Sequence, residues 1–231
     1  MLLYRNTYIT FTFIITLGLI EICGSNVDAD ELNPGVVSVE KPYGGLTQGE
    51  WSAKWWQWVL ELPADKNPLT EATGERCANG QGGPVWFLGG VWALGTEQTT
   101  RHCTIPSGVG IFFPIFNGEC STAEYPQFKT YTELRDCVID TNHEELLKMS
   151  ASVDGKVLQD LKRYKVESPP FNVTLPKNHV LGAAPEGLTP AYAIGWFVML
   201  EPLAKGPHTI EFSSSTGELF ATKVIYNILI E

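Results

Sequence analysis

The chain has 231 residues, of which 44% are hydrophobic and 11% aromatic, and its formal net charge is −10. This composition excludes an intrinsically disordered chain. Because an acidic protein repels phosphate backbones, we also expect no nucleic-acid partner. The 22 Gly and 15 Pro indicate many turns and short elements, which favours a β-rich fold over a helical bundle.

The first 25 residues have the layout of a secretory signal. Arg5 gives a positive start, residues 8–20 form an apolar run, and small residues follow around Gly24. A retained anchor is the alternative, although a spanning helix needs about 20 apolar residues. Cys23 follows the apolar run, so a lipid on Cys23 is a further alternative. We expect cleavage near residue 25 and a secreted or cell-surface protein, with membrane contact only through an uncleaved signal or that lipid.

Four cysteines remain once Cys23 is removed, and an even number in an exported chain indicates disulfides. Three pairings are possible. We predict Cys77–Cys103 and Cys120–Cys137, because each bond closes a short local loop. A zinc site is the alternative, but the sequence has no C-x-x-C pair and the cysteines are widely scattered.

The strongest local signal is a helix over residues 48–62. Thr47 and Glu50 form a T-x-x-E capping box at its start, four Trp lie between residues 51 and 58, and Pro63 ends it. The Trp spacing puts most of them on one helical face. We expect that face to pack against a sheet, although a sugar platform or a membrane-surface helix would also use Trp. Residues 26–46 are predicted to be an extended lead-in, and residues 47–231 a single domain.

Residues 63–84 are predicted to form a polar surface loop held by Cys77. Asp65, Asn67 and Glu71 offer oxygen ligands of the kind that Ca²⁺ prefers, so a calcium ion is an alternative. The spacing of an EF-hand fails, because Leu69 stands where another oxygen ligand should be. We otherwise expect no metal or cofactor.

The rest of the chain shows strand patterns separated by Gly, Pro and Asp-Gly turns. We expect a second helix over residues 132–148, broken near 140–142, and a turn at residues 213–215. Strands are expected at 85–91, 100–105, 109–116, 150–153, 156–158, 163–167, 171–175, 191–200, 208–212 and 220–230. This pattern predicts a mainly β fold, an antiparallel β-sandwich of jelly-roll or immunoglobulin-like type, with the Trp-rich amphipathic helix and a second short helix.

Several longer runs carry a resemblance. These are residues 49–58 (GEWSAKWWQW), 83–88 (GPVWFL), 112–121 (FFPIFNGECS) and 171–176 (FNVTLP). Over most of the mature chain the sequence resembles a functionally unassigned family of exported proteins from soil archaea and bacteria. The resemblance implies export and a single domain, and implies nothing about mechanism.

Catalytic motifs are weak. The G-x-S-x-G elbow and the phosphate-binding Gly motifs are absent, and Leu147 replaces the second His of H-E-x-x-H. Asn117, Glu119 and Glu124 follow a very apolar strand, and two carboxylates held there could act in glycoside hydrolysis. An Asn-Gly turn with solvated acids is the plainer interpretation.

Trp86, Trp92 and Trp196 lie in predicted strands and could form a stacking face for sugar rings, or could pack in the core. Asn172 begins an N-x-T sequon and is a candidate glycosylation site. Our leading hypothesis is a secreted, disulfide-stapled binding module for an extracellular glycan or envelope component, with these three Trp and Asn117 as contacts. The alternatives are an extracellular polymer hydrolase using Glu119 and Glu124, and a cell-surface structural protein.

Overall fold

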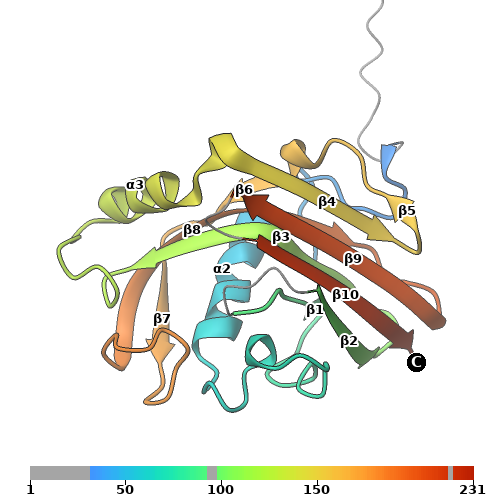
Figure 1. Cartoon of the computed structure of the whole chain (residues 1–231), viewed down its shortest axis with the longest axis horizontal. Helices are drawn as coiled ribbons and strands as arrows, with labels where there is room; N and C mark the ends of the chain where they lie inside the picture. Colours follow the sequence, from blue (N-terminus) through green and yellow to red (C-terminus); the bar gives the residue numbers. More distant parts are fainter. Residues whose placement is uncertain (1–31, 93–97, 218–220) are drawn as a thin grey trace, which may run out of the picture.

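The computed structural model describes residues 32–92, 98–217 and 221–231. The predicted signal and Cys23 lie outside these residues. The described chain forms two five-stranded sheets, two α-helices and three short 3₁₀ turns (Figure 1). In this part of the chain, no helix combines the length and the apolar character needed to cross a membrane.

The first sheet is built around two long central strands, β3 (Gly110–Ser121) and β8 (Gly187–Leu200), which pair antiparallel. Its strand order is β1-β3-β8-β6, and β7 also pairs with β8. The remaining bounds are β1 (Val85–Phe87), β6 (Lys165–Glu167) and β7 (Phe171–Leu175).

The second sheet has the order β2-β10-β9-β4-β5. Its bounds are β2 (Gln98–Ile105), β4 (Leu147–Val153), β5 (Lys156–Val157), β9 (Gly206–Thr216) and β10 (Ala221–Ile230). Burial alternates along most of β9 and β10, as expected for a sheet with one face in the core.

Each sheet contains one parallel pair, which corrects the predicted topology. β1 pairs parallel with β3, and β10 pairs parallel with β2 over eight residue positions. The expected mainly β class with two helices is confirmed. The expected antiparallel sandwich of jelly-roll or immunoglobulin-like type becomes a fold of two mixed sheets, because local strand patterns carry no information on the direction of distant partners.

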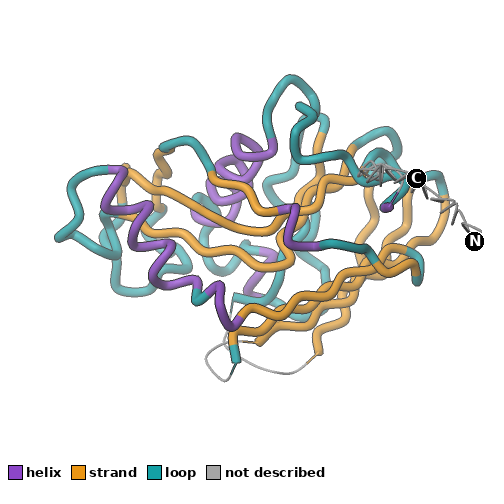
Figure 2. Tube along the Cα trace, turned by 90° about the horizontal axis from the view of Figure 1, so that it is seen from above, coloured by secondary structure: helices purple, strands orange, loops and turns teal. Residues whose placement is uncertain are grey.

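The two sheets share one apolar core, and α2 (Gln48–Leu60) covers the opposite face of the first sheet (Figure 2). Phe113 of β3 stacks on Phe212 of β9 across the inter-sheet core, with ring centroids 5.2 Å apart. On the α2 side, Trp55 packs edge-on against Phe197 of β8 at 5.9 Å. The first sheet is therefore apolar on both faces and lies in the middle of the molecule.

The helix α2 begins where the sequence predicts. Thr47 and Glu50 form the reciprocal capping box, and all four Trp of the helix are buried. Their predicted packing against a sheet is confirmed. The helix ends two residues earlier than expected, at Leu60.

The second helix, α3 (Tyr131–Asn142), is shorter than predicted. His143 adopts a left-handed backbone conformation with φ 47°, which ends the helix. A short 3₁₀ turn follows, and Leu147 already belongs to β4. Of the residues expected at the end of this helix, 144–146 form the 3₁₀ turn and 147–148 belong to β4 of the second sheet.

Both predicted disulfides are present. Cys77–Cys103 ties the loop before β1 to β2, and Cys120–Cys137 ties the end of β3 to α3. Two such bonds indicate folding in an oxidising, extracellular environment.

Candidate ligand-binding site

A cavity of about 190 Å³ lies where α2, the segment after β1 and the ends of both sheets meet. Its walls are largely aromatic. They include Trp55 and Trp56 of α2, Trp92, Phe116 of β3 and Phe212 of β9. Trp56 and Trp92 meet edge to face, with ring centroids 6.4 Å apart and an interplanar angle of 81°.

Four residues of the cavity wall carry a buried polar atom that has no hydrogen-bond partner among the described residues. The atoms are Trp56 Nε1, Asn117 Nδ2, Ser214 Oγ and Thr222 Oγ1. Leaving a buried donor or acceptor unpaired costs about 1–3 kcal/mol, and such atoms are uncommon in native proteins. Four around one cavity indicate a place where a polar molecule would be stabilised.

The described lining of this cavity contains no Asp, Glu, Lys, Arg or His. The described lining offers hydrogen-bonding groups, among them the hydroxyls of Ser214 and Thr222, together with aromatic side chains.

Asn117 reaches the cavity because of two local features of the first sheet. The register between β3 and β8 shifts between Pro114 and Phe116, and this irregularity reorients the residues that follow. Opposite Asn117 stands Gly195, where an added Cβ would lie 2.5 Å from the Asn117 Cβ. Because Gly195 has no side chain, there is room for the side chain of Asn117 at this position.

Hydrogen bonds fix both the backbone and the indole ring of Trp92. Its backbone N–H donates to the Leu69 carbonyl at 2.9 Å, and its indole Nε1–H donates to the Val180 carbonyl at 3.0 Å. The ring is half-buried and forms part of the cavity wall. Trp92 and Asn117, both predicted as ligand contacts, are thus brought together at one cavity.

The segment that leads to Trp92 is fixed by Arg101, a buried residue of β2. Arg101 Nη1 donates to the carbonyls of Gly89 and Gly90 at 2.9 and 2.8 Å, and to the Tyr226 hydroxyl at 2.9 Å. Its Nη2 donates to the Glu71 carbonyl at 2.6 Å. One guanidinium therefore joins the cavity wall to the loop before β1 and to β10.

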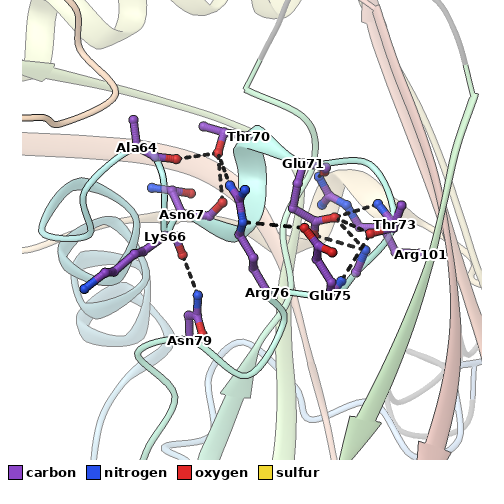
Figure 3. A network of polar contacts seen from close by, with 11 residues as sticks. Ala64, Lys66, Asn67, Thr70, Glu71, Thr73, Glu75, Arg76, Asn79 and Arg101 are labelled. Atoms are coloured by element: carbon purple, nitrogen blue, oxygen red, sulfur yellow. Dashed lines mark hydrogen bonds and ion pairs between the residues drawn. The ribbon is translucent and has the colours of Figure 1, made fainter.

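Polar contacts organise the loop of residues 63–84, and one group of them centres on Glu71 (Figure 3). Its carboxylate accepts hydrogen bonds from the backbone N–H groups of Thr73 and Gly74. Although burial by itself raises the pKa of Glu71, these bonds and the charge of Arg101 outweigh it and lower that pKa. Among the described residues, no group of three His, Cys, Asp or Glu is placed to hold a metal ion, and the calcium alternative stays an untested prediction.

Two of the three Trp predicted as a sugar-stacking face are in the core. Trp86 and Trp196 are 8% and 1% exposed. Trp196 packs behind the cavity wall against Phe116, with centroids 6.0 Å apart, and Lys165 Nζ lies 5.2 Å from its ring centroid. Neither ring belongs to the described cavity wall, so the three predicted Trp do not form one contact surface at this cavity. Alternating strand patterns give two faces but do not say which of them is covered.

Glu119 and Glu124 lie near enough to each other for the charge of Glu124 to affect the pKa of Glu119. Burial raises the pKa of Glu119 well above its ordinary value, and the hydrogen bond with Glu124 and the charge of that residue raise it further. Neither residue belongs to the wall of the cavity.

Sequence reasoning missed three contributors to this site, namely Ser214, Thr222 and Arg101. Residues 213–215 were expected in a turn but lie within β9, where Ser214 is buried and its neighbours are half-exposed. Position 220 of the predicted last strand is outside the described residues. Asn172 is exposed on β7, and its glycosylation stays a prediction.

The chain matches no family model and no curated protein. Two solved structures show faint similarity. One is a cysteine protease inhibitor, EhICP2, from Entamoeba histolytica, with 15% identity, a TM-score of 0.20, and coverage of 59% of this chain and 96% of that one. The other is Amebosin, with 9% identity, a TM-score of 0.19, and coverage of 59% and 99%. Scores this low establish no shared fold, and the chain is assigned to no family on these comparisons.

Proposed function

We propose that this protein is an extracellular binding module, and that its ligand is a carbohydrate or another component of a cell envelope. The observation that carries the proposal is the cavity itself, with aromatic walls, four unpaired buried polar atoms and an uncharged described lining. Ligand sites are typically concave and mostly apolar, with a few polar groups that fix orientation.

A sugar fits this combination better than a purely apolar molecule. The C–H faces of a sugar ring pack against aromatic side chains, whose faces carry negative charge density. Its hydroxyls both donate and accept hydrogen bonds, so they can pair with the indole of Trp56, the amide of Asn117 and the hydroxyl of Ser214. An apolar ligand would fill the space and leave those atoms unpaired.

The arrangement supports binding rather than hydrolysis. Neither carboxylate of the predicted hydrolase, Glu119 or Glu124, belongs to the described wall of the cavity. The proposed contacts are Trp92 and Asn117, which line the cavity, whereas Trp86 and Trp196 do not line it.

A glycan array probed with the disulfide-intact protein tests the proposal. We expect the wild type to bind a defined set of glycans and Trp92→Ala to bind them at least about tenfold more weakly, because Trp side chains at binding sites commonly contribute 2 kcal/mol or more.

Tyr131→Ala is the matched control, since Tyr131 is an exposed aromatic residue on α3 outside the cavity wall. It should bind like the wild type. Absence of binding to every glycan and to purified envelope polysaccharides, or equal binding by Trp92→Ala, would reject the proposal.

A further inference from the structure

The size of the cavity limits how much of a ligand it can hold. Its volume of about 190 Å³ is below the roughly 300–1,000 Å³ of sites for drug-sized ligands. It exceeds the roughly 150 Å³ of an engineered protein cavity that takes up benzene. There is room for one six-membered ring and its substituents.

The absence of charged side chains from the described lining determines whether the bound sugar ring can be acidic or must be neutral. The described lining has no cationic group to offset a carboxylate, sulfate or phosphate, and the chain as a whole carries a net charge of −10. Desolvating an anion in such a place is strongly unfavourable. Acidic sugars are therefore excluded by the same features that favour neutral ones.

From these observations we infer that the site recognises a single uncharged sugar residue end-on, as the terminal unit of a glycan, and not an internal stretch of an acidic envelope polymer. This inference rests on the proposed function and narrows it. The buried atoms of Asn117, Ser214 and Thr222 pair with hydroxyls of that one ring after small side-chain rotations, since in the ligand-free arrangement they are shielded from solvent.

Calorimetric titration with single-ring probes tests the inference. The probes are the methyl glycosides of glucose, galactose, mannose and N-acetylglucosamine, together with methyl glucuronide as the acidic ring and cyclohexanol as a ring with one hydroxyl. We expect at least one neutral glycoside to bind, and methyl glucuronide and cyclohexanol to bind at least about tenfold more weakly than that glycoside.

Ser214→Ala and Ser213→Ala form the matched pair of variants. They are neighbours on β9, but Ser214 is buried in the cavity wall and Ser213 is outside it. Loss of one hydrogen bond should weaken the best neutral glycoside about three- to tenfold in Ser214→Ala and leave Ser213→Ala unchanged. Equal urea midpoints for the two variants would show that the difference lies in binding.

The outcomes separate the two proposals. Binding of glycans on the array with no binding of any single ring, or equal binding of methyl glucuronide, would overturn end-on recognition of a neutral sugar and leave the binding module in place. Absence of binding in both experiments would overturn both. An equal loss of affinity for the glycoside in Ser214→Ala and Ser213→Ala would show that the ring binds outside this cavity.

Discussion

Arg101 is the residue whose burial most needs explanation, because it carries a charge and is only 1% exposed. It is sustained by three backbone carbonyls and the Tyr226 hydroxyl, and its guanidinium lies 5.7 Å from the centroid of the Tyr226 ring. The Gly90 carbonyl accepts a hydrogen bond from Arg101, whereas the Gly89 carbonyl accepts one from Arg101 and a second from the Tyr226 hydroxyl at 2.9 Å.

We therefore expect Arg101→Met to lower the free energy of unfolding by about 3 kcal/mol, because it removes four hydrogen bonds from a charged donor, including those to the part-buried carbonyls of Gly90 and Glu71. Urea denaturation measures this. Tyr226→Phe, which keeps the ring and removes the hydroxyl, should cost about 1 kcal/mol. In Arg101→Met the Trp92 indole N–H should also exchange faster with solvent. An unchanged urea midpoint would mean that Arg101 does not hold this segment.

The raised pKa of Glu119 predicts that the free energy of unfolding depends on pH. Its pKa is raised in the folded state, first by burial and then by Glu124, so the folded protein retains a proton that the unfolded chain loses near pH 4.3. Protonated Glu119 therefore contributes its full stabilisation below that pH. This stabilisation is lost as the pH rises through the pKa that Glu119 has in the folded protein.

In Glu119→Gln a neutral amide replaces the protonated acid. We expect this variant to be more stable than the wild type at neutral pH, by more than the roughly 0.5 kcal/mol typical of surface substitutions, and to lose the corresponding decline in stability with rising pH. Thermal unfolding from pH 4 to pH 8 measures both. Parallel curves for the two proteins would show that Glu119 is ionised in the folded state.

At the scale of elements, α3 depends on the Cys120–Cys137 bond. The helix has 12 residues, contributes only Leu134, Cys137, Val138 and Asn142 to the buried part of the molecule, and packs on the end of β3. Isolated helices of this length are marginal in water, so tertiary attachment decides its stability.

We expect the free energy of unfolding of the double variant Cys120→Ala, Cys137→Ala to be about 3 kcal/mol lower than that of the wild type, because the bond closes a loop of 17 residues. Hydrogen exchange should show the loss of protection concentrated in α3, with β9 and β10 retaining theirs. Uniform loss across both sheets would instead indicate that α3 and the sheets unfold together.

Local signals predicted the elements they encode. The T-x-x-E box and the Trp period predicted the start and buried face of α2, and the Asp154-Gly155 dipeptide, with φ values of 50° and 75°, predicted the β4–β5 turn. The end of α3 was missed because a left-handed His143 has no strong sequence signature. The parallel partner of β2 was missed because it lies more than a hundred residues further along the chain.

For the whole molecule, composition and cysteine pattern predicted a disulfide-linked β-rich fold, and the site was only half predictable. Trp92 and Asn117 stood out by residue type. Ser214 and Thr222 did not stand out, because whether they line the cavity depends on which face of β9 and β10 meets it. Trp86 and Trp196 had the right chemistry, but Trp86 is buried in the core between the sheets, and Trp196 packs against Phe116 beneath Lys165.

The parallel pairing of β2 with β10 also sets the order in which the molecule can be assembled. Position 98 meets position 223, and position 105 meets position 230. Contacts of such long range are slow to form, because the loop-closure entropy must be overcome before they stabilise the chain. Thr222 lies on β10, so this part of the cavity wall is complete only once β10 has paired with both β9 and β2. The cavity wall at Thr222 therefore forms together with the long-range strand pairing, which is a slow step of folding.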